Sequence, residues 1–554
     1  MCGIWGLLAD EATFSQVHEK EFMKIAARGP DLTVVVNAYP NVWLGFHRLS
    51  IVQEDGVPSE QPIIHNDIWL ICNGELYNHE DLKAKSELDE VMNGASDCAA
   101  LIHSFRRFKG DLRRTCASID GVFAFLMVDS ENLYIGRDPV GVRPLFYGST
   151  TKGGLVFGSE MKCIERLCSR IQIFPPGCCA TVPLKYSSPF LIDIKHYYSV
   201  PSIADRSMTF DLSQMLIQHA LISAVRKRLM GNRRFGFMLS GGLDSSLIAA
   251  IASRHLDDQP PLAFSIGFED SPDIESARIV ASFLGIKHQV VIVTPEQCFC
   301  MIPKVIYALE TFEPLLVRCG VVHYILCEYI SRTSDVKVLL SGEGADELFG
   351  SYCYMQKAPS PMHLHREILR RMKLLNQYDV LRCDRATSCH GLEIRVPFLD
   401  KLFIDLVMRL PACDKLFPDK IEKYLLRSAF DGWLPKEVLW RGKEGFSEAL
   451  GQIDFGELIQ EHASSLISDS QFAIRSQLFP NQTPETKEEF WYRALFESFF
   501  DYRKVAATIH TKVYRTAAWQ TSDKKENVFL LAPVVAVGRL RRRSTGSSLE
   551  DNAA

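Results

Sequence analysis

A cysteine directly follows the initiator methionine, in the opening sequence MCGIWG. If a peptidase removes Met1, Cys2 carries both a thiol and a free α-amine, and the pKa of such an amine is about 7.7–8.0. The amine can take the thiol proton, directly or through a water, so one residue supplies both nucleophile and base. A cysteine at position two is often incidental, so this prediction depends on the motifs that follow it.

A second set of chemical residues lies where an apolar strand turns into a helix, in the sequence RFGFMLSGGLDSSLIAAI. Small residues let backbone amides approach an anion, and the N-terminus of the following helix adds a favourable dipole. The loop has no lysine at Walker A spacing. It predicts a phosphate site of another kind, formed by Ser240, Gly241, Gly242, Asp244 and Ser245.

An acidic turn, SGEGADELFGSY, follows a further apolar strand, VKVLLS. Glu343, Asp346 and Glu347 fall within five residues. Magnesium prefers oxygen ligands, often one or two carboxylates together with phosphate oxygens. Asp244 and Asp346 are therefore the predicted magnesium ligands. The alternative, a solvated acidic loop, does not explain the apolar strand before it.

Composition excludes several classes of protein. A net charge of −5 argues against nucleic-acid binding, and no apolar run reaches the roughly 18 residues of a membrane span. The 16 cysteines lack zinc spacing, and no secretory signal is evident, so we expect reduced, mostly buried thiols and a cytoplasmic protein.

The strand and helix signals change character along the chain. Short strands punctuated by glycine, proline and aspartate predict an α+β domain with packed antiparallel sheets over residues 2–186. From residue 206 strands and helices alternate, which predicts an α/β domain with a parallel sheet over residues 206–515. Residues 516–554 are predicted to be a flexible tail.

The motifs of the first domain, taken together, carry a family resemblance. CGIWG is followed in order by ARGPD, FHRLSIV, CNGELYN, ASD and GRDPVGVRPLFY. In this order they resemble the class II glutamine amidotransferase domain, which has the fold of the N-terminal-nucleophile hydrolases. The resemblance implies that Cys2 attacks the side-chain amide of glutamine, forms a γ-glutamyl thioester and releases ammonia.

The predicted glutamine pocket has residue types that suit a zwitterion. Arg48 can bind the α-carboxylate in a bidentate fork, while Glu75 and Asp97 can balance the ammonium. Asn73 and the backbone N–H of Gly74 suit an oxyanion hole. By resemblance, main-chain groups of Arg48, Leu49, Ser50, Ile51 and Val52 complete the pocket. The alternative for Arg48 and Asp97 is a surface ion pair.

The second domain carries a related resemblance. SGGLDSS resembles the pyrophosphate loop of the ATP-pyrophosphatase superfamily, whose members activate a carboxylate as an acyl-adenylate. With CDRATSCHGLEIRVPFLD, IEKYLLR and RGKEGFSEAL, the whole chain resembles the glutamine-hydrolysing asparagine synthetases. The resemblance implies an ATP site that includes Leu239, Ile266, Ser341, Gly342 and Lys443, with Glu343 acting in adenylate formation and ammonia attack. Asp384 and Arg395 are expected either to support this site or to form salt bridges.

The implied reaction converts L-aspartate, L-glutamine and ATP into L-asparagine, L-glutamate, AMP and pyrophosphate, through β-aspartyl-AMP and with Mg²⁺. Ammonia would have to cross between the domains along an apolar passage, because burying the charged ammonium ion is costly. The expected partners are these small molecules; a homodimer is left open, and neither nucleic acid nor membrane is expected.

One segment departs from the family pattern. The family shows Thr-Thr-x-Arg-Ala-Ser, whereas this chain has LLVRCG, with Leu315 and Leu316 at the threonine positions and Arg318 retained. Each lost buried hydrogen bond would cost about 1–3 kcal/mol of binding to aspartate or the adenylate. Two alternatives therefore stay open: a synthetase of the same architecture acting on another carboxylate, and an impaired paralogue with a regulatory role.

Overall fold

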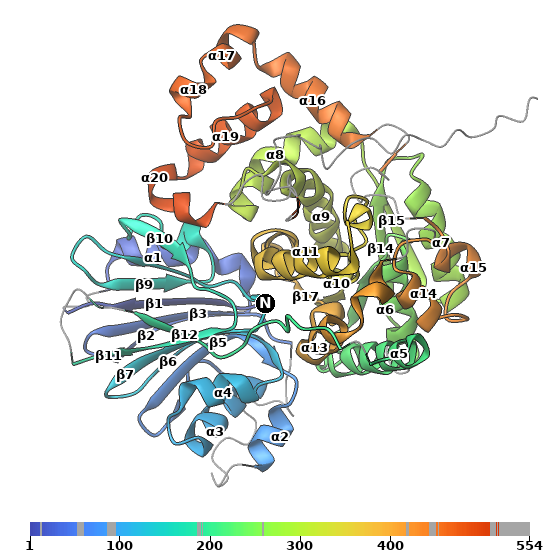
Figure 1. Ribbon diagram of the computed structural model, residues 1–554. Helices are drawn as coiled ribbons and strands as arrows, with labels where there is room; N and C mark the ends of the chain where they lie inside the picture. The colour runs from blue at the N-terminus through green and yellow to red at the C-terminus, as the bar shows by residue number, and fades with distance from the viewer. Residues whose placement is uncertain are drawn as a thin grey trace, which may run out of the picture.

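The computed structural model describes residues 1–10, 14–51, 60–85, 96–185, 190, 192–205, 207–256, 260–416, 420–442, 450–451, 454–509, 517 and 519. These residues form two lobes, with a group of C-terminal helices beside both of them (Figure 1). Within this part of the chain, no helix combines the length and the apolar character that a bilayer crossing requires.

The first lobe contains two antiparallel six-stranded sheets. The first has the order β10 (Arg170–Ile173), β8 (Phe146–Ser149), β9 (Leu155–Gly158), β1 (Gly3–Leu8), β3 (Val42–Arg48) and β2 (Leu32–Tyr39). The second has the order β12 (Asp193–His196), β11 (Cys178–Pro183), β7 (Asn132–Arg137), β6 (Gly121–Val128), β5 (Ile68–Leu76) and β4 (Ile63–His65). The prediction of packed antiparallel sheets is confirmed.

A shared apolar core holds the two sheets face to face. Side chains of β1 and β3, such as Ile4 and Phe46, pack with Ile71 of β5 and Leu126 of β6. Four helices complete the layers: α1 (Gln16–Met23), α2 (His79–Ala84), α3 (Ala100–Arg107) and α4 (Leu112–Ser118). Because helices α3 and α4 cover the outer face of the second sheet, every residue of β6 is buried, which explains its continuous apolar sequence GVFAFLMV.

The second lobe is built on a parallel five-stranded sheet. Its order is β15 (Lys287–Ile292), β14 (Leu262–Gly267), β13 (Phe235–Met238), β16 (Val338–Leu340) and β17 (Glu393–Arg395). The sheet contacts one group of helices that includes α6 (Leu243–Ser253) and α7 (Pro272–Leu284), and another that includes α9 (Pro314–Thr333) and α12 (Asp379–Ser388). The predicted α/β architecture is confirmed.

The remaining helices surround this sheet or extend from it. They are α5 (Phe210–Lys227), α8 (Pro295–Leu309), α10 (Ala345–Phe349), α11 (Pro361–Leu374), α13 (Lys401–Arg409), α14 (Tyr424–Ala429), α15 (Lys436–Leu439), α16 (Phe455–Leu466), α17 (Asp469–Ala473), α18 (Arg475–Leu478), α19 (Lys487–Phe499) and α20 (Tyr502–Val505). Helix α5 is the first helix of the second lobe. Thr209 caps its N-terminus by accepting a hydrogen bond from the N–H of Leu212, and the positive charges of Arg226 and Lys227 in its last turn interact favourably with the helix dipole.

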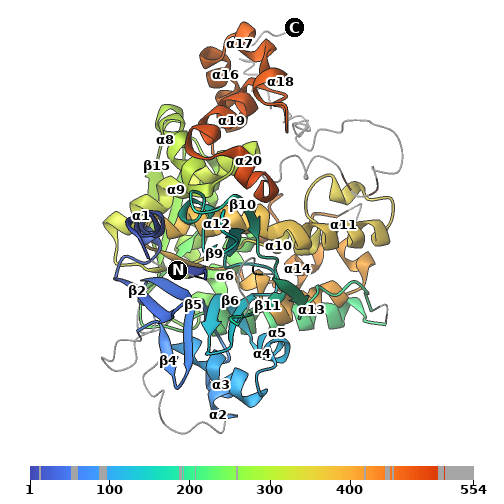
Figure 2. The same ribbon diagram turned by 90° about the vertical axis from the view of Figure 1, so that its left-hand side faces the viewer.

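The last helices connect the two lobes. Helix α19 packs on α8 and α9, whereas α20 packs on β10 of the first lobe. Figure 2 shows α16 to α19 grouped at the top of the molecule, with α20 below them beside β10.

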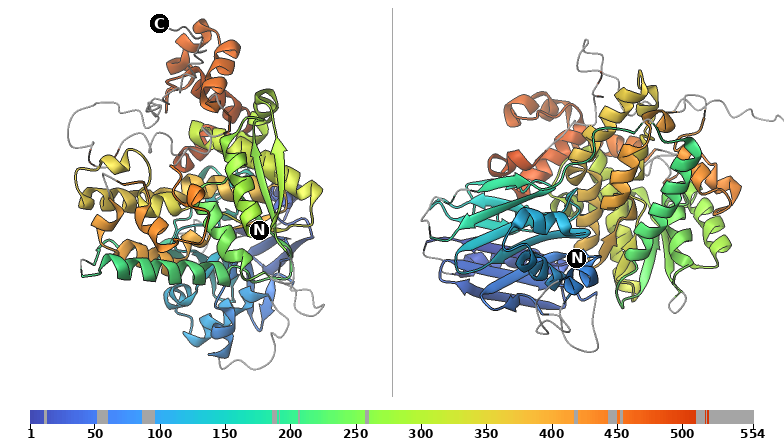
Figure 3. Two further views of the ribbon diagram at one scale, coloured as in Figure 1. Left: turned by 90° about the vertical axis from the view of Figure 1, so that its right-hand side faces the viewer. Right: turned by 60° about the horizontal axis from the view of Figure 1, so that its bottom comes forward.

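The two lobes share one continuous apolar core. Leu49 and Val142 of the first lobe belong to the same buried cluster as Leu221 and Phe235 of the second. The N-terminus lies at the junction of the lobes, as Figure 1 and both views of Figure 3 show. The predicted boundaries at residues 186, 206 and 515 stay predictions.

Two candidate active sites and their interface

The sulfur of Cys2 lies against the turn that follows β3. Its Sγ accepts the N–H of Leu49 at 3.5 Å and donates to the Leu49 carbonyl at 3.8 Å. Burial raises the pKa of the Cys2 thiol to about 11, and the charges of Glu393 and Glu75 act in the same direction. The thiol therefore needs a nearby base before it can act as a nucleophile at neutral pH.

The α-amine of the chain is on Met1 and is buried. Its ammonium group is 3.6 Å from the carboxylate of Glu393, which belongs to β17 of the second lobe. Burial lowers the pKa of this amine. Because Met1 is only 1% exposed, it fills space at the junction of the lobes and withholds from Cys2 the amine that the predicted chemistry requires.

Asn73 has the environment expected of a ligand-binding group. It lies on β5, is completely buried, and neither atom of its side-chain amide has a hydrogen-bond partner among the residues that the structure describes. An unpaired buried polar group costs about 1–3 kcal/mol, so this amide is suited to receive a bound substrate or oxyanion. Its neighbour Gly74 lies so close to β6 that a Cβ there would be 2.3 Å from the carbonyl oxygen of Val122.

Two buried acids follow this amide. Asp97 accepts hydrogen bonds from the Leu76 N–H at 2.6 Å and from the Ser96 hydroxyl at 2.9 Å. Burial raises the pKa of both Asp97 and Glu75. Glu75 also lies 3.5 Å from the guanidinium of Arg395, a residue of the second lobe. A pocket with two buried carboxylates suits the ammonium group of an amino acid.

The structure describes the predicted carboxylate-binding segment up to residue 51. Arg48 is buried and donates to the hydroxyl of Ser50 at 3.2 Å, while the N–H of Ser50 donates to Asp31 at 2.7 Å. Leu49 and Ile51 are buried beside them. The last predicted residue of this segment, Val52, lies outside the described residues. The structure thus joins Cys2 to this segment through Leu49, and Arg48 is buried rather than exposed at the surface.

The predicted phosphate loop connects β13 to α6. The Ser245 hydroxyl lies 3.0 Å from that of Ser240, and the N–H of Gly242 donates to Ser240 at 3.3 Å. Gly241 has φ +72°, and a Cβ there would be 2.5 Å from the backbone nitrogen of Ala277, so glycine is required. Leu239 and Ile266 line a small, mostly apolar cavity beside the loop, at the place where the adenine is expected.

The acidic turn after β16 lies directly against this loop. A Cβ on Gly342 would be 2.7 Å from Cβ of Asp244, and the hydroxyl of Ser341 accepts the N–H of Glu343 at 3.3 Å. The predicted magnesium ligands converge on one cation, because the ammonium of Lys423 contacts both Asp244 and Asp346, the latter at 2.5 Å. The two carboxylates lie close enough together to share one cation, and phosphate oxygens would have to complete a magnesium site there.

Sequence reasoning missed Lys423 at this site. The lysine is buried, has φ +55° and precedes α14. Its signal was present in the motif IEKYLLR, but nothing in the motif says which side chain points toward the acids. The predicted Lys443 lies outside the described residues.

Glu343 belongs to a second cluster of charges that sequence reasoning also missed. Its carboxylate accepts a hydrogen bond from Arg382 at 2.5 Å, and Arg382 also donates to His323 at 3.1 Å and to Asp379 at 3.4 Å. Burial raises the pKa of Glu343. Arg382 immediately precedes the motif CDRATSCHG, so its sequence neighbourhood was the available signal.

The unusual LLVRCG segment forms the first turns of α9. Arg318 makes a bidentate pair with Glu488 of α19, with distances of 2.8 and 2.5 Å. Leu316 is buried, and Leu315 lies one helical turn before Cys319 on the same face. His323 lies one further turn along this face and accepts a hydrogen bond from Arg382 at 3.1 Å, so this face of α9 is directed toward the Glu343 cluster.

Asp384 and Arg395 form ion pairs across the interface between the lobes. Asp384 accepts two hydrogen bonds from Arg28 of the first lobe, at 2.8 and 3.1 Å. Arg395 donates to Glu393 at 2.7 Å and approaches Glu75. The salt-bridging alternative considered for these two residues is therefore what the structure shows. The ammonia passage stays a prediction.

Comparisons with known proteins match both lobes. A family model described as a glutamine amidotransferase domain matches residues 1–176, and one described as asparagine synthase matches residues 216–362 and 356–524. The protein named asparagine synthetase [glutamine-hydrolyzing] from Cricetulus griseus is 39% identical over 533 residues, which cover 90% of this chain and 94% of that protein. The protein of the same name from Homo sapiens is 38% identical with the same coverage.

Among solved structures, the allosteric regulatory enzyme of purine biosynthesis aligns over 52% of this chain and 80% of its own. The identity is 14% and the TM-score is 0.31, a likeness too low to bear on function.

Proposed function

The chain belongs to the glutamine-hydrolysing asparagine synthetase family, and we propose that its two lobes carry out the two halves of one reaction. It makes L-asparagine from L-aspartate with nitrogen taken from L-glutamine, and membership of the family implies ATP use. A cytoplasmic location and a homodimeric assembly stay predictions.

In the first lobe, removal of Met1 leaves the α-amine on Cys2. That amine takes the thiol proton, and the sulfur attacks the amide carbon of glutamine. The unpartnered amide of Asn73 and the N–H of Gly74 stabilise the negative oxygen, which is worth about 2.7–4 kcal/mol for one such donor. Collapse of this intermediate releases ammonia and leaves a γ-glutamyl thioester, which water then hydrolyses to glutamate.

Burial of Met1 determines when it must be removed. A residue that is 1% exposed between two lobes is out of reach of a peptidase once the lobes have closed. We therefore expect removal on the growing chain, before the second lobe has folded against the first.

In the second lobe, the apolar cavity beside Leu239 and Ile266 takes the adenine, and the loop at Ser240–Ser245 takes the phosphates. Asp244 and Asp346 would hold Mg²⁺, which supplies positive charge to the phosphate oxygens. The carboxylate of aspartate then attacks the α-phosphate of ATP, giving β-aspartyl-AMP and pyrophosphate. Ammonia then attacks the β-acyl carbon and displaces AMP, and Glu343, held by Arg382, takes the proton that the attacking nitrogen loses.

The unpartnered amide of Asn73, buried in the same lobe as Cys2, is the single observation that carries this proposal. A binding or regulatory protein has no need of an orphaned oxyanion donor in its core. The apolar face at Leu315 and Leu316 favours one second candidate, a synthetase of the same plan acting on another carboxylate. A panel of carboxylic acids, assayed for AMP release, separates the two.

The proposal is tested with wild type and the Cys2→Ala variant, by assaying asparagine, AMP and glutamate. We expect Cys2→Ala to lose glutamine-dependent synthesis and to keep synthesis from added ammonia, because the nucleotide site does not involve the thiol. Absence of asparagine with either nitrogen source in the wild type would refute the proposal.

A further inference from the structure

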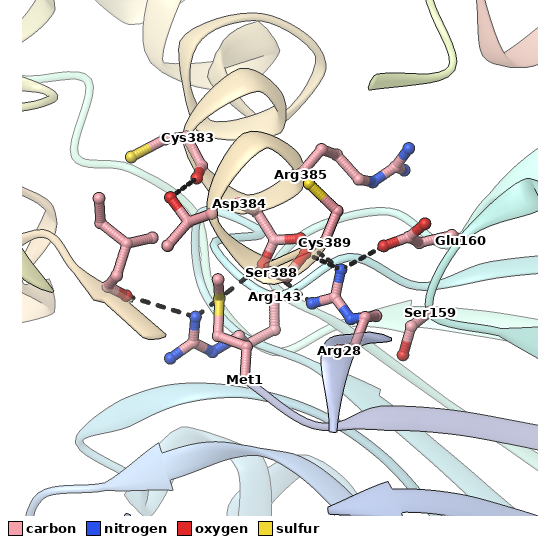
Figure 4. A network of polar contacts seen from close by, with 12 residues as sticks. Met1, Arg28, Arg143, Ser159, Glu160, Cys383, Asp384, Arg385, Ser388 and Cys389 are labelled. Atoms are coloured by element: carbon pink, nitrogen blue, oxygen red, sulfur yellow. Dashed lines mark hydrogen bonds and ion pairs between the residues drawn. The ribbon is translucent and has the colours of Figure 1, made fainter. Parts of the chain in front are cut away.

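The guanidinium of Arg28 is the centre of a buried network that joins the two lobes (Figure 4). Arg28 lies in the ARGPD motif and is 1% exposed. It donates to Glu160 of its own lobe at 2.6 Å. On the side of the second lobe it donates to the carboxylate of Asp384 at 2.8 and 3.1 Å and to the hydroxyl of Ser388 at 2.9 Å.

The same side chain holds the backbone of the nucleophile. The Nε–H of Arg28 donates to the carbonyl oxygen of Cys2 at 3.0 Å. Chain ends fray unless they are tied down, and Cys2 becomes the chain end once Met1 is removed. Removal of Met1 also removes the ammonium that lies against Glu393. The position of the Cys2 thiol then depends on its contacts with Leu49 and on the hydrogen bond from Arg28.

The two residues of helix α12 that accept hydrogen bonds from Arg28 lie on one face of the helix. Asp384 and Ser388 are four residues apart, the spacing that aligns side chains on a helix. Asp384 is 2% exposed, and two hydrogen bonds from one guanidinium fix the orientation of that planar group as well as its position. An arginine without Asp384 would keep Glu160 but could rotate away from the Cys2 carbonyl.

We propose that Asp384, a residue of the synthetase lobe, is a positioning residue for the amidotransferase nucleophile, acting through Arg28 on the Cys2 carbonyl. This inference rests on the proposed function, because it assumes that Cys2 attacks glutamine. It assigns to the second lobe a direct part in glutamine hydrolysis that is separate from its own ATP chemistry. Arg382, two residues before Asp384 on α12, connects the same helix to Glu343.

The test compares Asp384→Asn with wild type in the full-length, Met1-processed protein. Asparagine has nearly the same shape but replaces one acceptor with a donor that opposes the guanidinium. We expect kcat for glutamate release to fall about tenfold or more with KM for glutamine changed less than about twofold, since small displacements of a reacting atom can cost about a hundredfold. Synthesis from ammonia should stay within about twofold of wild type.

Glu310→Gln is the matched control. Glu310 is also a buried carboxylate of the second lobe, and it accepts the N–H groups of Met161 and Lys162 at 3.0 and 2.6 Å as well as a bond from Arg385. Glu310 therefore connects the first lobe to the second lobe and to α12, and its bonds to Met161, Lys162 and Arg385 do not involve Cys2. We expect it to lower thermal stability while leaving kcat for glutamate release within about twofold.

A purely structural role of Asp384 predicts that Asp384→Asn and Glu310→Gln lose glutaminase kcat equally and that ammonia-dependent synthesis falls in parallel. Either result would overturn the inference. If Asp384→Asn does not fold, Ser388→Ala gives the answer, with a loss in glutaminase kcat of about threefold and unchanged KM. A wild type that releases glutamate but makes no asparagine would refute the proposed synthesis and leave this test intact. A wild type that releases no glutamate would refute both.

Discussion

Leu315 is a residue at which this chain departs from the family pattern, and it lies in the first turn of α9. The leucine is half-buried on the face of α9 that is directed toward the Glu343 and Arg382 cluster, and the neighbouring Arg318 is fixed by Glu488. An apolar side chain there supplies no hydrogen bond to a polar substrate.

Replacement of Leu315 by threonine is expected to lower the KM for aspartate about fivefold, because one added hydrogen bond is worth about 1 kcal/mol. Leu315→Val is the control, since valine has the shape of threonine without its hydroxyl. Steady-state synthesis from ammonia, measured by asparagine formation, gives both KM values. Equal KM values for the two variants would show that Leu315 does not face the acceptor.

Helix α9, together with α8, connects the C-terminal helices to the second lobe. Its Arg318 and the Glu488 of α19 are both buried, and the pair is bidentate. Breaking a buried ion pair by removing one partner leaves an uncompensated charge, which costs about 3–5 kcal/mol. The retained arginine of LLVRCG thus has a structural role that its sequence motif did not suggest.

The Glu488→Gln variant is expected to lower the free energy of unfolding by about 3 kcal/mol and to speed hydrogen exchange in α19. Lys487→Ala is the control, because Lys487 pairs with an aspartate, Asp469, that is 97% exposed, and such pairs contribute about 0–1 kcal/mol. Similar exchange rates in the two variants would contradict the assigned role of the Arg318 pair.

At the scale of the whole molecule, buried carboxylates hold the lobes together. Burial acts to raise the pKa of Glu160, but Lys162, Arg28 and Arg385 outweigh it and lower that pKa to about 2. Burial also acts to raise the pKa of Glu393. The charges of Arg395, the Met1 ammonium and Arg143 outweigh it and lower that pKa to about 2. Both acids favour the folded state only while they are ionised.

This linkage predicts acid sensitivity of the interface. Since the folded pKa of Glu160 is below its unfolded value of about 4.5, its stabilisation is complete above pH 4.5 and is lost as pH falls toward 2. Denaturant unfolding of wild type and Glu160→Gln, carried out from pH 7 to pH 3, measures the contribution of ionised Glu160 to the free energy of unfolding. The wild type should be more stable at pH 7, and the difference should shrink below pH 4.5; a difference independent of pH would contradict the prediction.

The sequence by itself determined the local features. Short strands separated by turn residues predicted the antiparallel sheets, alternating strands and helices predicted the parallel sheet, and small residues between a strand and a helix predicted the phosphate loop, because these properties follow from short stretches of the chain. Through the family resemblance, the motifs also predicted that Cys2, Asn73, Glu75 and Asp97 belong to one site.

Only the tertiary structure decided which distant side chains meet. Lys423 reaches Asp244 from 179 positions away, and Arg28 reaches Asp384 from 356 positions away. No local pattern encodes such a pairing, because it depends on how helices and strands pack. The same holds for the burial of Met1 against Glu393: the sequence shows that a methionine precedes the nucleophile, but packing of the second lobe decides that it is enclosed.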